Sequence, residues 1–134
     1  MMRSISAAFV LAAVTILAAA AVQAQPLPQR VNVPFKFSLA DKAYPASMYY
    51  FRYEAASNQL EVLGRDKNLM VRVPVVTRLA QKASAKDNGN VRLVFDQVGE
   101  ERYLSEVWFP SSDGLLIRAT AERHKHEEVD AAAQ

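Results

Sequence analysis

The sequence contains no cysteine, which excludes disulfide bonds, thiolate metal ligands and a cysteine nucleophile. Stability must therefore come from a hydrophobic core alone. Only four glycines are present and they do not cluster, so there is no glycine-rich loop to cradle a phosphate. An excess of charge of one sign is also missing, since 16 Lys and Arg stand against 14 Asp and Glu. This near-balance argues against a nucleic-acid-binding protein.

The only long apolar run lies at the start of the chain. Arg3 provides a positive charge, residues 7–22 are apolar apart from one threonine, and Ala24 ends the run with a small side chain. This order predicts a signal peptide over residues 1–24 that is cleaved after Ala24, with Ala21 as the weaker alternative. The other interpretation is an uncleaved membrane anchor, but a run of about 16 residues is short for a span of about 20. We therefore expect an exported protein, periplasmic or extracellular, with no membrane span after cleavage.

Cleavage leaves about 110 residues, which is the size of one domain. Because Arg3 is the only charged residue removed, 15 of the 16 basic side chains and all 14 acidic ones remain. Within this mature chain we expect a polar linker at 25–30, a β domain at 31–119 and a C-terminal helix or tail at 120–134.

Short segments in which apolar and polar residues alternate run through the whole β domain. A period of two is typical of a strand with one buried face, and turn-forming residues separate the segments. Pro34 and Pro74 lie on the polar sets of two such runs, and since proline cannot donate to a ladder, the first of these strands should lie at an edge or be bulged. The expected strands cover 31–39, 47–54, 60–62, 69–79, 91–95, 102–109 and 115–117, with a turn at 40–46.

This pattern predicts an all-β fold, namely a single antiparallel β-sandwich or partly closed barrel of about seven short strands. The facing of the strand at 102–109 stays open, because neither of its two alternating sets is apolar throughout.

The C-terminal segment is rich in Ala, Glu, Arg and Lys, which favours a short solvated helix or a frayed tail from about residue 120. It contains His124 and His126, the only histidines of the chain. A strand would place both side chains on one side, as a metal site requires, whereas a helix would turn them about 200° apart. Because the composition favours a helix, we interpret the pair as part of a charged tail. We expect no metal site and no cofactor, with weak adventitious Zn²⁺ or Ni²⁺ binding as the alternative.

Three further side chains are singled out by their surroundings. Glu106 lies inside an otherwise apolar stretch, so the preferred interpretation is a buried ion pair with a partner such as Arg92, Arg102 or Arg118. A functional acid and simple exposure are the alternatives. Tyr50 and Trp108 fall outside the main apolar sets of their strands. Exposed aromatics on a sheet are a platform for sugars, peptides or apolar ligands, although both rings could instead pack under neighbouring segments.

Signals for catalysis are weak. A Gly-x-Ser-x-Gly motif is absent, and both histidines lie in the expected tail rather than in a rigid site. Paired carboxylates could be formed by Glu106 with Asp96 or Glu54 on neighbouring strands.

Several segments resemble a family of short exported β-rich bacterial proteins. The residues that carry the resemblance are Val31-Asn-Val-Pro-Phe-Lys-Phe-Ser38, Tyr44-Pro-Ala46 with Tyr49, Tyr103-Leu-Ser-Glu-Val-Trp108 and Ala121-Glu-Arg123. Ser47 departs from the pattern, since glycine is usual at that place in the family. No activity is assigned to the family, so the resemblance implies a small exported β domain and leaves its chemistry open.

These observations give three hypotheses for the function. The first is an exported, non-catalytic binding or interaction module whose partner is an unknown small ligand or envelope protein. The second is a structural or assembly protein that pairs through an edge strand at 31–39 or 69–79. The third is a small hydrolase that uses paired carboxylates.

Overall fold

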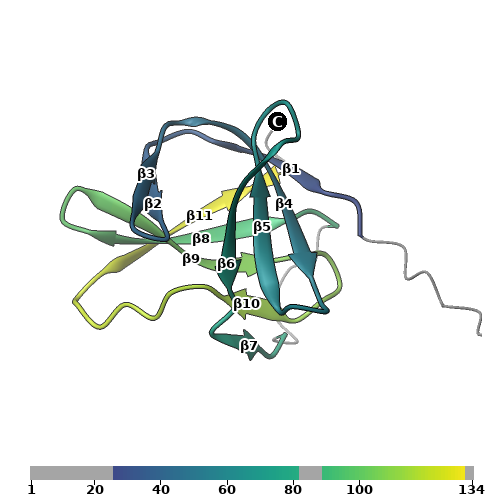
Figure 1. Ribbon diagram of the computed structural model, residues 1–134. Coiled ribbons are helices and arrows are strands. Elements are labelled where there is room, and N and C mark those ends of the chain that lie inside the picture. The colour runs from purple at the N-terminus through teal and green to yellow at the C-terminus, as the bar shows by residue number, and fades with distance from the viewer. Residues whose placement is uncertain (1–25, 82–88, 132–134) are drawn as a thin grey trace, which may run out of the picture.

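The computed structural model describes residues 26–81 and 89–131, so the expected signal peptide over residues 1–24 lies outside the described residues, as do residues 25, 82–88 and 132–134. The described chain is all-β and forms two sheets that do not close into a barrel (Figure 1). This confirms the β-sandwich. The strands are β1 (Gln29–Val33), β2 (Phe37–Leu39), β3 (Lys42–Tyr44), β4 (Ser47–Glu54), β5 (Gln59–Leu63), β6 (Leu69–Pro74), β7 (Thr77–Leu79), β8 (Arg92–Val98), β9 (Glu101–Trp108), β10 (Gly114–Leu116) and β11 (Lys125–Asp130).

The strands are divided between a smaller and a larger sheet. Sheet A has the order β1-β4-β5-β6 and is antiparallel throughout. Sheet B has the order β11-β8-β9-β10-β7, and the β2–β3 hairpin joins it through a parallel pairing of β2 with β9. Figure 1 shows the strands of sheet A crossing those of sheet B steeply, with the shared core between them.

Both prolines of the expected strands lie where the chain changes sheets. The run 31–39 is divided at residues 34–36 into β1 of sheet A and β2 of sheet B, and the run 69–79 is divided directly after Pro74 into β6 of sheet A and β7 of sheet B. A proline supplies no N–H for the ladder, so the pairing ends there and the chain is free to cross. Since β1 and β6 are the two edges of sheet A, the expectation of an edge strand is confirmed.

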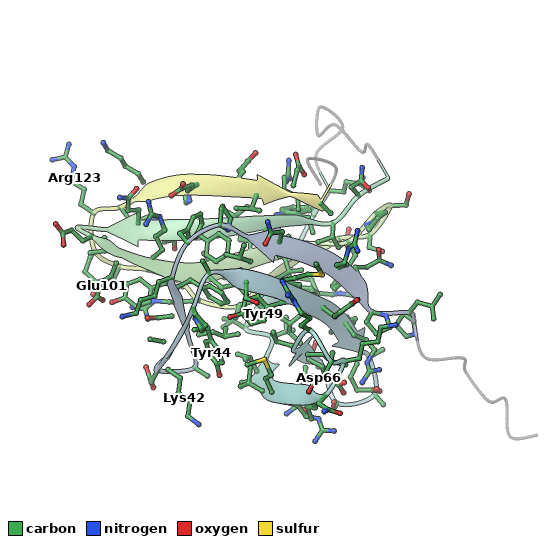
Figure 2. All side chains as sticks on the ribbon, turned by 90° about the horizontal axis from the view of Figure 1, so that it is seen from above. Lys42, Tyr44, Tyr49, Asp66, Glu101 and Arg123 are labelled. Atoms are coloured by element: carbon green, nitrogen blue, oxygen red, sulfur yellow. The ribbon has the colours of Figure 1, made fainter. Side chains whose placement is uncertain are left out.

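The core is formed by alternate residues of both sheets, as the sequence pattern predicted. At its centre, Phe37 is 1% exposed and contacts three other rings. The centroids of Phe95 and Tyr49 lie 5.4 Å from that of Phe37, both edge to face, and the stacked ring of Tyr44 lies 5.7 Å away. Tyr44 and Tyr49 lie close together (Figure 2). Because Tyr49 belongs to sheet A and Phe37 to sheet B, this cluster fastens the sheets to each other.

A bulge in β9 explains which residues of this strand face the core. Val94 pairs with Glu106 whereas Phe95 pairs with Leu104, so Ser105 is an extra residue in the ladder. The extra residue reverses the alternation, and Leu104 and Val107 therefore both face the core at 1% and 0% exposure. Because of this reversal, no single alternating pattern fits residues 102–109.

The expected turn at 40–46 contains a strand. Lys42–Tyr44 forms β3, and Leu39 pairs with Lys42, so the turn itself consists of Ala40 and Asp41 alone. Both residues have positive φ, 50° and 62°, as a two-residue hairpin turn of this kind requires.

The expectation of a C-terminal helix is wrong, because residues 125–130 form β11 and pair with β8 along six residues. As a helix, this segment would have few apolar side chains to bury. As a strand, it forms backbone hydrogen bonds with the open edge of β8 and packs Val129 against the core. No helix among the described residues is long and apolar enough to cross a membrane.

Candidate metal centre on the outer face of sheet B

The outer face of sheet B, directed away from the core, carries a row of polar side chains. In the strand register His126 of β11 lies opposite Asp96 of β8, and Asp96 lies opposite Tyr103 of β9. Asp96 follows the core residue Phe95 and therefore points to the outer face. The row thus joins three strands that are far apart in the sequence.

The connection from β10 to β11 passes over this row. It must travel from one side of β9 to the far side of β8, since the strand order is β11-β8-β9-β10 (Figure 1). On the way Arg118 stacks on the Tyr103 ring, 3.8 Å from its centroid, and His124 reaches Asp96. Because the connection between β10 and β11 covers this row, Asp96 is only 1% exposed although it is an acidic residue on an outer face.

Two imidazole rings converge on one oxygen of Asp96. The Nδ1 atom of His126 lies 2.9 Å from Oδ1 of Asp96, and Nε2 of His124 lies 3.6 Å from the same oxygen. The two rings stand edge to face, with centroids 4.8 Å apart. One ligand atom from each of the three residues lies within 4.8 Å of the others.

The orientation of His124 is fixed by the backbone. Its Nδ1 atom lies 2.7 Å from the carbonyl oxygen of Glu122. A carbonyl oxygen only accepts, so Nδ1 must donate the hydrogen bond and, in the neutral ring, Nε2 is left with a free lone pair directed at Asp96. A histidine that ligates a metal typically has this arrangement, with its other ring nitrogen donating to a carbonyl or carboxylate.

Two imidazoles and one carboxylate form a ligand set for a divalent transition metal. Zn²⁺ binds such nitrogen and oxygen atoms at about 2.0–2.1 Å, so tetrahedral ligands lie roughly 3.4 Å apart. The separations of 2.9 and 3.6 Å between Oδ1 of Asp96 and the two imidazole nitrogens lie on either side of that value, and all three ligand atoms lie within 4.8 Å of one another. Mg²⁺ and Ca²⁺ prefer sites built from six or more oxygen ligands, so imidazole nitrogen favours Zn²⁺, Ni²⁺ or Cu²⁺.

Glu106 lies on the same outer face, opposite Val94, and is half-buried. Burial raises its pKa above the ordinary value of 4.5, and the negative charge of Asp96 acts in the same direction. His126, Arg92 and a hydrogen bond from the Trp108 indole oppose the rise. The ion pairs found in the described part of the chain do not include Glu106.

The three arginines expected to be partners of Glu106 have other contacts. Arg102 pairs with Glu127 at 2.7 Å, Arg118 stacks on Tyr103, and Arg92 lies over the Trp108 ring, 5.4 Å from its centroid. Arg92 therefore acts on Glu106 through its charge at longer range.

Replacing Glu106 with glutamine is expected to raise the midpoint of thermal unfolding at pH 7. A pKa raised by folding means that the native state favours the neutral carboxyl, so the ionised form destabilises the fold as pH rises through the folded-state pKa. Well below pH 4.5 the acid is protonated in both states, and the gain should vanish. Unfolding of the EDTA-treated protein, measured across this range, tests the prediction. Glu128→Gln, which removes an exposed charge from the same face, is the control. A Glu106→Gln variant that is less stable at pH 7 would contradict it.

The structure places the two aromatic candidates on different sheets. Tyr50 lies in β4 of sheet A, with the Lys67 ammonium 5.5 Å from its ring centroid. Trp108 lies in β9 of sheet B, directly over Gly114. Both are partly buried and carry a cation on the ring, so they do not combine into one ligand platform.

Sequence reasoning missed two buried carboxylates. Glu61 of β5 is buried on the outer face of sheet A, where it pairs with Arg52 and Arg72 on the two neighbouring strands. Asp96 was considered only as a partner for Glu106. Its link to the histidines had no signal in the sequence, because it depends on β11 being a strand beside β8.

No protein-family model, curated protein or solved structure matches the chain.

Proposed function

We propose that the protein is an exported, non-catalytic binding module that captures a divalent transition-metal ion through Asp96, His124 and His126. The observation that carries the proposal is the convergence of two imidazole nitrogens on one oxygen of a nearly fully buried aspartate. The apolar run over residues 1–24, which ends in small residues, supports export.

The local hydrogen bonding favours an ion in this place. A neutral His124 that donates Nδ1–H to Glu122 points its Nε2 lone pair at a carboxylate oxygen, and two lone pairs repel each other. A cation between them removes the repulsion and balances the buried negative charge of Asp96. Arg102 and Glu127 pair close by, between β9 and β11, and hold β11 beside β8 so that the ligands are aligned in advance.

Zn²⁺ is expected to bind the EDTA-stripped protein with one ion per chain and to raise its thermal stability. At a free Zn²⁺ concentration of 100 times Kd, the stabilisation is about 2.7 kcal/mol. Isothermal titration calorimetry and thermal unfolding measure the two effects, and Mg²⁺ should produce neither.

The variants distinguish this site from adventitious binding. His124→Ala and His126→Ala should each weaken Zn²⁺ binding about 100-fold, because each removes one of three ligands. Glu122→Ala keeps the backbone carbonyl and should bind Zn²⁺ as the wild type does. Absence of one-to-one binding, or histidine variants that bind as tightly as Glu122→Ala, would refute the proposal. Circular dichroism checks that each variant is folded.

A further inference from the structure

A second recess opens at the corner where the β2–β3 hairpin, β6 and β9 meet. Its volume is about 370 Å³, which lies in the lower part of the range of small-molecule sites. Its lining combines polar and charged residues with apolar ones, among them Val73, Leu104 and Ile117. None of the three proposed metal ligands lines this recess, so the two sites share no ligand residue.

Arg118 forms part of the rim and has no carboxylate partner among the ion pairs of the described residues. Its Nε atom is enclosed and has no hydrogen-bond acceptor. The guanidinium is held by stacking on Tyr103, whose hydroxyl is in turn hydrogen-bonded to Glu101. A guanidinium fixed in this way at the recess, with no carboxylate partner among the ion pairs of the described residues, can pair with an anionic group of a ligand.

The opposite charge is present on the same rim. Asp41 and Glu101 both line the recess, and Asp41 is held in position by the tight turn with φ of 62°. A ligand that is only anionic would be repelled by these two carboxylates, and a ligand that is only cationic would be repelled by Arg118. The charges are complementary to a molecule that carries both an ammonium and a carboxylate group.

We propose that this recess binds a free α-amino acid with an apolar side chain. Its carboxylate pairs with Arg118, its ammonium group is bound by Asp41 and Glu101, and its side chain covers Val73, Leu104 and Ile117.

L-Leucine is the probe, and two of its analogues separate the charges. We expect calorimetry on the EDTA-treated protein to show leucine binding. Both 4-methylpentanoate, which lacks the ammonium group, and 3-methylbutylamine, which lacks the carboxylate, should bind at least about tenfold more weakly, because each loses a charge-assisted contact. Absence of leucine binding, or equal binding of leucine and either analogue, overturns the proposal.

Two variants assign the contacts. Arg118→Met keeps an extended apolar stem on Tyr103 and should weaken leucine binding at least about tenfold, while binding of 3-methylbutylamine stays the same or becomes tighter because a repelling charge is removed. Asp41→Asn keeps the turn, since asparagine tolerates positive φ, and should weaken leucine binding, while binding of 4-methylpentanoate stays the same or becomes tighter for the same reason. Arg123→Met is the matched control, because Arg123 is exposed on the same connection and projects away from the domain (Figure 2).

Leucine binding should persist in His126→Ala, and Zn²⁺ binding should persist in Arg118→Met. The metal site and the amino-acid site can therefore be refuted independently of each other. If Arg118→Met and Asp41→Asn both bind leucine as tightly as Arg123→Met does, the recess is not the site and the inference is overturned.

Discussion

Replacing Phe37 with alanine lowers the free energy of unfolding by about 3–5 kcal/mol, which is the expected cost of removing a buried phenylalanine. The ring is 1% exposed and contacts Tyr44, Tyr49 and Phe95. Alanine leaves a cavity between the two sheets, where three rings lose their shared neighbour. Domains of this size are typically stable by about 5–15 kcal/mol, so the variant retains only part of its stability.

Urea unfolding measures this loss as a lower midpoint with an unchanged slope. The control is Val76→Ala, because Val76 is an apolar residue with 61% of its surface exposed. Val76→Ala should change the free energy of unfolding by no more than about 0.5 kcal/mol. A Phe37→Ala variant that loses less than about 1 kcal/mol would show that the core does not depend on this ring cluster.

The second large effect is expected at Gly114. A Cβ atom there would lie 2.6 Å from the indole of Trp108, which occupies the space above the glycine. Because Gly114 pairs with Trp108 in the β9–β10 ladder, neither residue can move away without disturbing the pairing. We expect Gly114→Ala to cost about 1–3 kcal/mol through this overpacking.

A double-mutant cycle identifies the cause of that loss. Trp108→Val removes the indole. In this background, Gly114→Ala should lower the free energy of unfolding far less than it does in the wild type, which corresponds to a coupling energy of about 0.5–3 kcal/mol. Additive losses would contradict the packing explanation. The Trp108 ring packs on Gly114 and lies beneath Arg92, so the same experiment measures how much this ring contributes to the packing of the sheet.

Much of the candidate site could be recognised from the sequence only as single residues. His124 and His126 stood out as the only histidines, whereas Asp96 was considered only as a possible carboxylate partner of Glu106. What joined them was the pairing of β11 with β8, which places His126 directly opposite Asp96. The composition of residues 120–134 pointed to a helix, and on a helix the two rings would diverge. Local propensity is a weak guide where an open sheet edge competes for the segment.

The recess beside Arg118 could not be anticipated at all. Its walls come from the β2–β3 hairpin, from β6 in the other sheet and from the connection after β10. The sequence placed Asp41 in a turn, but the contact of Arg118 with Tyr103 depends on how the connection passes over sheet B.

The sequence by itself determined the all-β class, the residues that alternate into the core and the edge position of the strand that begins at residue 31. These features follow from local stereochemistry, since a period of two and a missing N–H act within a few residues. The tertiary structure decided the division of two long runs between the sheets, the bulge at Ser105 and the strand at Lys125–Asp130. Each of these depends on which backbone donors and acceptors a distant segment leaves open, and that information lies outside any short window of the sequence.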